Sequence, residues 1–562
     1  ELPGSFVLTL NAGNGISPLP ADPLLSQLMP DEAALDLYST LEALKHASTD
    51  ARVKAVFLDL TGSQYDLTTI EEIGGALAAL RAAGKPVVAF SETFSEGENS
   101  IIPYLAATYS GEIWMQPYGM VALLGVGAEV PFFKDALERL GARFETEHRN
   151  EAKTAFNSFT ENGFTPAHRA QTEKLLRDVL AVVSPKLTTN RPALQPLESL
   201  FAEGFYMGQG AVDKKLVDQL GYIDDVRARL FALYNGGTAP EGAVITADED
   251  WLVSIERYHG GKPESLLKTA YLGEKKDKAE KPAALALVYM NGEIVRDTDG
   301  GFGGDEGKIT AAQYSEVFAD IAADASIKAV VLRIDSPGGG FTASDTLRNA
   351  INTLRENHKT IIISMGSVAA SGGYMLASAG DKIFALPGTI TGSIGVIGGK
   401  PVFQDAASKL GVKVERVGTG DLVNMFSPLS SFNDKERAAF RRQVDFSFAA
   451  FKEIVAESRG LNPAEIDTVS GGHVFFGEEA VRLKLVDALG GLDAAISEAQ
   501  ESSGQPKDQP LEVRLYPQAE LPWLAFLQGQ FGGLVRATLH AAFGLPYDNS
   551  ALKAQATIPA VH

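Results

Sequence analysis

One serine and one lysine, far apart in the sequence, have the surroundings that best suit covalent chemistry. Ser371 lies in Ala-Ala-Ser-Gly-Gly, just after the apolar run Thr360 to Met365, which predicts a buried strand. A serine at a strand-to-helix corner, followed by glycines with exposed N–H groups, suits a nucleophile that attacks a carbonyl carbon. Ala-Ser-Gly-Gly also occurs where a helix packs tightly on a sheet, and serine is a common N-cap residue. By itself, this segment favours packing over catalysis.

A base for this serine has to come from elsewhere in the chain. Lys153 has apolar neighbours in Ala152, Ala155 and Phe156. Burial among apolar side chains disfavours the ammonium form and lowers the lysine pKa, which leaves an amine able to take the proton of a serine hydroxyl. A surface lysine beside Glu151 is the simpler interpretation, and only the internal repeat described below favours the catalytic one.

A second N–H group for a developing oxyanion is expected from Asp-Ser-Pro-Gly-Gly-Gly, Asp335 to Gly340. A strand that ends in this sequence turns sharply and leaves glycine N–H groups unpaired beside the sheet edge, where an extended peptide could add as another strand. The N–H groups of Gly339 and Gly372 would form the oxyanion hole. A tight turn without a catalytic role is the alternative for this segment.

Histidine and metal chemistry have little support. His148 lies near Lys153, and His358 precedes the strand before Ser371, but neither occurs in a recognisable triad motif. We expect surface or capping roles for both. No pair of histidines has zinc-ligand spacing such as HExxH, so we expect no metal and no other cofactor.

Short β-branched runs alternate with helix-period segments around these residues, and the succession occurs twice. Such alternation predicts an α/β fold. The segments are AVFLDL (Ala55 to Leu60), a helix from Ile70 to Ala83 and PVVAF (Pro86 to Phe90), then AVVLRID (Ala329 to Asp335), a helix from Ala343 to Arg355 and TIIISM.

The two successions are copies of each other. Tyr104 to Trp114 aligns with Tyr374 to Phe384 at an offset of 270 residues, and Gly208 to Gly221 resembles Gly477 to Gly490 at an offset of 269. At the first offset Ser371 corresponds to Ile101, and Lys153 corresponds to Val423. One copy has the serine and the other has the lysine, which is the pattern expected of a single active site divided between two halves.

Composition limits the function classes. The 562 residues carry a formal net charge of −21, which argues against nucleic acid as a partner. Because cysteine is absent, disulfides and thiolate catalysis are excluded. The sequence contains no run of eighteen or more apolar residues, the length that spanning a bilayer would require. The chain begins with Glu1 rather than Met, so we expect that an upstream signal or anchor has been removed.

We predict four parts. Residues 1–258 form an N-terminal domain that supplies the lysine, and residues 259–282 are a linker rich in charge. Residues 283–502 form a C-terminal domain that supplies the serine. Residues 503–562 are an extension, whose apolar stretch 521–545 is expected to pack within the fold, to contact another subunit or to lie on a membrane.

IDSPGGG, AASGGYMLAS and PGTITGSIGV (Pro387 to Val396), with Lys-Thr-Ala at Lys153, resemble the long, duplicated form of the signal peptide peptidase A family, also called protease IV. The likeness covers about Leu2 to Glu501. It implies tandem ClpP/crotonase-like domains of repeated ββα units and a dyad in which Ser371 is the nucleophile and Lys153 the general base. It also implies oxyanion donors that match Gly339 and Gly372.

The resemblance further implies an endopeptidase that degrades cleaved signal peptides at the periplasmic face of a bacterial inner membrane. Hydrophobic peptides would be its substrates, and several protomers, a tetramer, would assemble on the membrane through an N-terminal anchor that this sequence lacks. The segment NEAKTAFNSF departs from the family, which more often has Gly and Tyr before the lysine and Pro-Phe after it. A crotonase-type acyl-thioester enzyme and a catalytically silent membrane scaffold are the alternatives.

Overall fold

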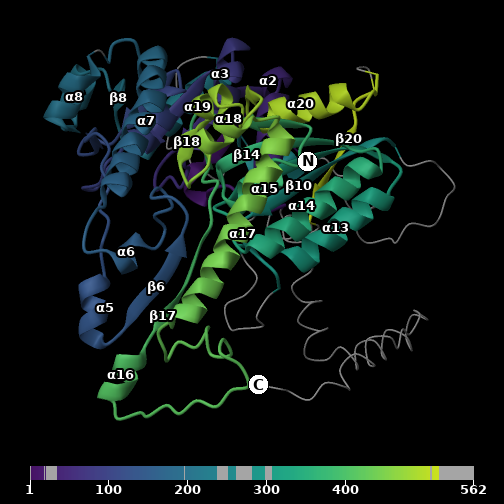
Figure 1. Cartoon of the computed structure of the whole chain (residues 1–562). Coiled ribbons are helices and arrows are strands. Elements are labelled where there is room, and N and C mark those ends of the chain that lie inside the picture. The colour runs from purple at the N-terminus through teal and green to yellow at the C-terminus, as the bar shows by residue number, and fades with distance from the viewer. Residues whose placement is uncertain are drawn as a thin grey trace, which may run out of the picture.

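The computed structural model describes residues 2–17, 19–20, 35–194, 196–236, 251–260, 282–297, 307–506 and 509–517. Each copy of the repeat forms its own, mostly parallel β-sheet with helices packed on it (Figure 1). Most of the predicted linker and all of the apolar stretch 521–545 lie outside the described residues.

The first sheet is entirely parallel, with the strand order β8-β4-β3-β2-β1-β9. Parallel strands are usually covered on both faces, and every residue of β3 is buried. Asp36 and Asp66 accept backbone N–H groups as the N-caps of α2 and α3. The elements are β1 (Phe6–Asn11), α2 (Leu37–Thr49), β2 (Val53–Asp59), α3 (Leu67–Ala82), β3 (Val87–Ser91), α4 (Ile101–Thr108), β4 (Glu112–Met115), β8 (Gln219–Leu220), α10 (Ile223–Asn235) and β9 (Leu252–Ser254).

The second sheet has the order β18-β16-β14-β13-β10-β20, with β15 and β19 branching from β14. The predicted strand TIIISM continues to Ala370, next to Ser371. The elements are β10 (Ala284–Asn291), α13 (Ala311–Ala323), β13 (Ile327–Ser336), α14 (Phe341–Glu356), β14 (Thr360–Ala370), α15 (Gly372–Ala377), β15 (Lys382–Ala385), β16 (Ile390–Gly392), β18 (Val474–Phe476), β19 (Ala488–Leu489), α20 (Leu492–Ser502) and β20 (Glu512–Tyr516).

The strand connections repeat between the halves. In the first half β5 (Met120–Ala122) pairs antiparallel with β7 (Phe205–Met207), as β16 pairs with β18 in the second. The late strands β9 and β20 each return to pair with the first strand of their own sheet. The predicted duplicated α/β architecture is therefore confirmed. The second sheet extends past residue 502, the predicted end of the C-terminal domain, because it includes β20.

A pair of strands projects from the two sheets. In Figure 1, β6 (Arg143–His148) and β17 (Ile397–Val402) run side by side towards the lower left, and each is close to a short helix, α5 (Lys134–Leu140) or α16 (Gln404–Lys409). The remaining elements are η1 (Ala12–Asn14), α6 (Asn157–Thr160), α7 (Pro166–Asn190), α8 (Leu197–Glu203), α9 (Gln209–Asp213), α11 (Ile255–Gly260), β11 (Glu293–Val295), β12 (Lys308–Thr310), α17 (Asp434–Arg459), α18 (Pro463–Val469) and α19 (Gly477–Arg482).

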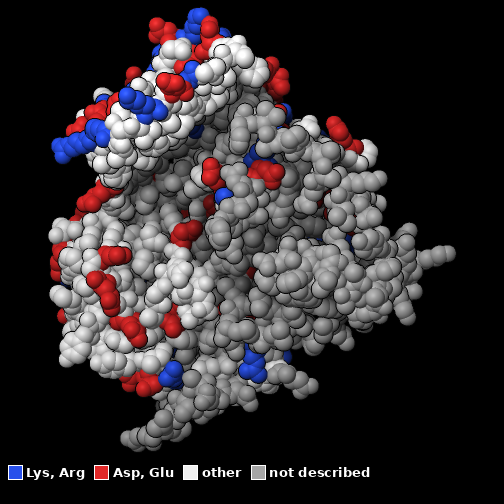
Figure 2. Space-filling view, turned by 90° about the horizontal axis from the view of Figure 1, so that it is seen from below, with Lys and Arg blue, Asp and Glu red and all other residues white. Residues whose placement is uncertain are grey.

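The surface reflects the acidic composition. Seen from below, the described surface shows more acidic than basic side chains and is hollowed beneath a projecting ridge (Figure 2). Across the described ranges, we find no helix with both the length and the apolar character needed to cross a bilayer.

The two halves share a core. Leu37 and Leu41 of α2 pack with Leu285 and Leu287 of β10, on the face of the second sheet. This burial of aliphatic side chains from both halves favours one fixed arrangement of the two sheets.

A buried ion pair also joins the halves. Glu72 of α3 lies 2.7 Å from Arg333 of β13, and both side chains are less than 10% exposed. Glu72 also accepts the N–H of Leu492 at 2.9 Å, and Arg333 donates to Ser364 Oγ at 2.9 Å. Each charge is therefore satisfied by the pair and by polar neighbours.

Glu72→Ala should lower the free energy of unfolding by about 3–5 kcal/mol, because it leaves the Arg333 charge buried without its partner. Urea unfolding followed by circular dichroism measures this loss. Glu72→Ala combined with Arg333→Met should recover much of it, and Glu42→Ala, which breaks an exposed pair with Lys45, should change little. A Glu72→Ala protein as stable as the parent would contradict a structural role for the pair.

Candidate active site

Ser371 occupies a sharp corner between β14 and α15. Its φ is +55° and its ψ is −120°, a conformation that residues with a side chain rarely adopt. The corner is held by two hydrogen bonds, from Ser371 N–H to the Gly392 carbonyl at 2.9 Å and from Met375 N–H to the Ser371 carbonyl at 3.0 Å. The predicted strand-to-helix corner is present, and it keeps the Ser371 hydroxyl at the end of a buried strand.

The structure brings Lys153 to Ser371 within one chain. Lys153 Nζ lies 3.1 Å from Ser371 Oγ, although 218 residues separate them. The strand pair β6 and β17 explains the approach, because the antiparallel register places His148 opposite Ile397. The chain that leaves β6 therefore reaches Lys153 beside the segment that leaves β16.

Gly472 of the second half makes room for the lysine segment, and Gly395 lies beside it. Gly472 has a φ of +90°, and a Cβ atom there would lie 2.7 Å from Lys153 N. A Cβ atom on Gly395 would lie 3.4 Å from Lys153 Cδ. At Gly472 any side chain would collide with the Lys153 backbone and would also strain its own. The lysine segment and this loop are thus in direct backbone contact.

Ser393 also contacts the lysine, and our sequence analysis did not assign it a role. Its Oγ lies 2.9 Å and its carbonyl oxygen 3.0 Å from Lys153 Nζ. Its φ is +50°, and its N–H donates to the His473 carbonyl at 2.6 Å. The repeat carried a signal for it, because the residue that corresponds to Ser393 in the first copy is Leu123.

The lysine is buried and faces neutral oxygens. The residue is only 8% exposed, and burial lowers the pKa of Lys153 to about 8. Its hydrogen-bond partners, Ser371 and Ser393, carry no charge, and no carboxylate within the described ranges forms a salt bridge with it. Without an anion to hold the proton, about a tenth of the side chain is the neutral amine at pH 7, far more than for a lysine in water.

The predicted oxyanion glycines lie together. Ile294 N–H donates to the Gly338 carbonyl and Gly340 N–H donates to the Ile294 carbonyl, both at 2.9 Å. Because alternate residues of an extended strand point to opposite sides, the N–H of Gly339 points away from Ile294. A Cβ atom on Gly372 would lie 3.2 Å from Gly339 N, so the two residues are adjacent. Gly372 is the first residue of α15, where the N–H has no intrahelical acceptor.

Asp335, the first residue of the glycine turn, supports the end of β14. Its carboxylate accepts the N–H groups of Ser367 and Val368, each at 3.1 Å. Asp66 of the first half accepts the Ser367 hydroxyl at 2.6 Å. Burial raises the pKa of Asp335, and these N–H groups act in the opposite direction. Both halves thus fix the backbone that leads into Ser371.

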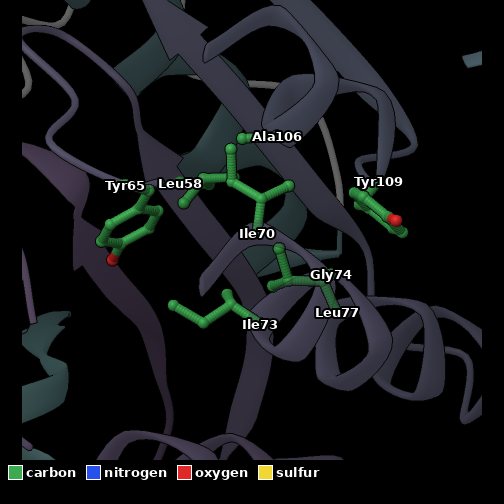
Figure 3. A pocket seen from close by; sticks show the side chains of 8 residues that line it. All are labelled: Leu58, Tyr65, Ile70, Ile73, Gly74, Leu77, Ala106 and Tyr109. Atoms are coloured by element: carbon green, nitrogen blue, oxygen red, sulfur yellow. The ribbon is translucent and has the colours of Figure 1, made fainter. Parts of the chain in front are cut away.

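Other candidate features lie apart from this site. His148 Nδ1 contacts the Asn150 carbonyl at 2.9 Å, and His358 is an exposed turn residue with a φ of +58°. An apolar cavity of the first half includes neither Ser371 nor Lys153 in its lining (Figure 3). It is lined by Leu58, Tyr65, Ile70, Ile73, Gly74, Leu77, Ala106 and Tyr109. We interpret it as imperfect packing between α3 and α4.

The class of protein follows from this frame and from two sequence profiles. The profile described as Clp protease matches residues 306–392, which include the glycine turn and Ser371. The fold is accordingly a tandem of ClpP-like domains. The profile described as Peptidase family S49 matches residues 79–235 and 353–505, one segment in each half and together more than half of the chain. The chain belongs to peptidase family S49.

Named relatives agree with this membership. Protease 4 of Salmonella typhi is 29% identical over 520 residues, which cover 90% of this chain and 78% of that protein. Protease 4 of Haemophilus influenzae is 28% identical, with 84% and 74% covered. The chloroplastic serine protease SPPA of Arabidopsis thaliana is 25% identical, with 84% and 67% covered. The protein is a serine peptidase, which argues against the acyl-thioester alternative.

Ser393→Ala should lower kcat on a fluorogenic peptide roughly tenfold to a hundredfold with little change in KM, because Lys153 loses a contact that orients its amine. Steady-state kinetics measures both constants. Ser470→Ala is the matched control, since Ser470 is a buried serine of the neighbouring loop that bonds Asp467 instead. An unchanged kcat in Ser393→Ala would show that the Oγ contact is dispensable.

Proposed function

We propose that the protein is an endopeptidase with a serine/lysine dyad, in which Ser371 is the nucleophile and Lys153 the general base. The observation that carries the proposal is the 3.1 Å separation of Lys153 Nζ and Ser371 Oγ at a buried site. The lowered lysine pKa supports it, because a base has to be neutral before it accepts a proton.

The proposed reaction has two stages. Neutral Lys153 takes the Ser371 proton as Oγ attacks the scissile carbonyl carbon, and the N–H groups of Gly339 and Gly372 hold the resulting oxyanion. The lysine ammonium then protonates the leaving amine, and an acyl enzyme remains. Lys153 next takes a proton from water, the hydroxide attacks the ester, and Ser371 regains its proton. These steps require no metal or organic cofactor.

We propose hydrophobic peptides, the remnants of signal peptides, as substrates. The name of one relative supports this, a putative signal peptide peptidase SppA of Enterococcus faecium that is 28% identical over 249 residues. The turn at 338–340 bonds Ile294 on one side, and its other side, to which the Gly339 N–H points, is where an extended peptide could lie against the sheet. Following the resemblance, we place the protein on the periplasmic side of a bacterial inner membrane, as a homo-oligomer held there by an anchor.

Ser371→Ala and Lys153→Met should each lower kcat/KM for a fluorogenic peptide by at least about a thousandfold, because each removes one partner of the proton transfer. A fluorophosphonate probe should label the parent and fail to label Ser371→Ala. Lys359→Met is the control, since Lys359 is also a buried lysine whose pKa is lowered by burial, but it bonds the carbonyls of Asp324 and Ile327. Undiminished cleavage by either dyad variant would contradict the mechanism.

The pH dependence should report Lys153. Below its pKa of about 8 the lysine is protonated and inactive as a base, so kcat/KM should rise about tenfold per pH unit up to that point and level off above it. The measurement is kcat/KM from pH 6 to 9.5, with circular dichroism to verify that the fold persists. A profile that is flat over this range would rule out a lysine of this pKa as the base.

A further inference from the structure

Two segments of the chain lack the partners that their repeat counterparts have. Within the chain, β6 of the first copy pairs with β17 of the second. At the repeat offset of 270, β17 corresponds to residues 127–132, and β6 corresponds to residues 413–418. Neither counterpart belongs to a β-ladder among the described residues, and both are largely exposed. In Figure 1 the green trace that follows α16, which contains residues 413–418, runs along the lower edge of the molecule.

The correspondence is anchored on both sides. LLGVGAEVPFF (123–133) and SIGVIGGKPVF (393–403) share one glycine, one valine, one proline and one phenylalanine position in register, and Pro131 with Pro401 is one of these pairs. The short helices α5 and α16 follow these segments at the same offset, and both are followed by a glycine, Gly141 or Gly411. The counterparts are therefore equivalent positions in the two copies.

The glycines after the short helices show that one surface is occupied and the other is open. Gly141, with a φ of +80°, packs on α16, and a Cβ atom there would lie 2.5 Å from Ala406 N. Its carbonyl accepts the Ala406 N–H at 2.9 Å. Gly411 has nearly the same conformation, with a φ of +77°, but nothing lies within 4 Å of its Cβ position. The backbone at Gly411 thus has the conformation that lets Gly141 pack on a helix, but no helix among the described residues packs on Gly411.

We propose that residues 413–418 pair antiparallel with residues 127–132 of a second copy of this chain, in the register of β6 with β17. In that register Arg416 lies directly opposite Glu129 of the partner subunit. Opposite charges on directly paired residues favour an antiparallel ladder. Within the chain, Lys400 and Glu145 form such a pair, one step along the ladder from Thr146 and Gly399, the positions equivalent to Arg416 and Glu129. The interaction goes beyond the proposed assembly because it names the surfaces that meet.

A second charge pair is matched in the same way. Arg143 of β6 lies 3.0 Å from Asp405 of α16. Their counterparts are Lys413 and Asp135, again one basic and one acidic residue. The proposed interface thus provides an acidic partner for Lys413, namely Asp135 of the partner subunit.

Segment 413–418 carries an exposed apolar residue where β6 carries a charged one. Glu147 of β6 lies 2.9 Å from Arg437 and 3.1 Å from Arg441 of α17. The counterpart of Glu147 is Val417, which is 99% exposed. In the proposed register Ala128 of the partner subunit lies opposite Val417, so the interface would cover Val417 instead of leaving it in water.

These surfaces define a head-to-tail assembly. Each copy presents one segment of each kind, 127–132 and 413–418, and the two segments differ. The contact is therefore heterologous and closes into a ring when the rotation between copies permits it. The step between copies would repeat the step between the two halves of one chain. A free edge strand is otherwise a site of uncontrolled association, which the pairing removes.

Disulfide trapping tests the register, because the natural chain has no cysteine. Ala128→Cys with Val417→Cys, an opposed pair in the proposed register, should give a ladder of covalent oligomers on a non-reducing gel. Ala128→Cys with Lys413→Cys is the off-register control, since the two positions would lie about 13 Å apart along the strands. Mixing the single variants Ala128→Cys and Val417→Cys should give dimers only, and neither single variant should cross-link with itself.

Charge reversal gives a second test that needs no cysteine. Arg416→Glu should weaken association roughly tenfold in sedimentation velocity of the full chain, and Glu129→Arg in the same chain should restore it. A ladder in the opposed pair together with this rescue supports the interface. Equal cross-linking of the off-register pair, no cross-linking in the opposed pair, or a chain that stays monomeric at high concentration would overturn it.

Discussion

The antiparallel pairing of β6 with β17 is the contact on which the site depends. Six residue pairs join a strand of the first half to a strand of the second, and the ladder ends where the chain turns towards Lys153. Because a one-residue slip would turn every side chain of β6 to the other face, the register also determines which way the following segment leaves. Lysine and serine are 218 residues apart in the sequence, and the pairing of β6 with β17 brings them together.

Close backbone packing and burial then act together on the lysine. Gly472 lets the loop of the second half touch the Lys153 backbone, and that contact removes the side chain from water. Desolvation is the cause of the lowered pKa, since the surrounding oxygens of Ser371 and Ser393 are neutral. An acidic neighbour would have had the opposite effect. The lowered pKa of the amine therefore depends on the lack of a bonded carboxylate among the described residues as well as on burial.

The two copies share the same fold but differ in the residues of the candidate site. Both halves keep the strand order, the short helices α5 and α16 and the antiparallel pairs β5 with β7 and β16 with β18. Ser371, Ser393 and the glycine turn at 335–340 occur only in the second copy, and Lys153 only in the first. In the proposed mechanism the site is divided, so catalysis requires a fixed arrangement of the two halves, which the shared core and the Glu72–Arg333 pair stabilise.

The amino-acid sequence determined the alternation of strands and helices and the duplication, because periodicity and internal repetition are properties of the chain itself. Comparison of the two copies also singled out Ser371 and Lys153, each of which is present in one copy and replaced in the other. The sequence could not show that Lys153 and Ser371 meet in one chain, since β6 and β17 are joined by hydrogen bonds that no local pattern encodes. It also left Ser393 unassigned, because an isolated serine in Thr-Gly-Ser-Ile-Gly acquires its meaning only from the amine 2.9 Å away. Likewise, β20 belongs to the second sheet because its backbone pairs with β10, more than two hundred residues earlier. Contacts between residues so far apart depend on how the sheets pack, so only the tertiary structure decided them.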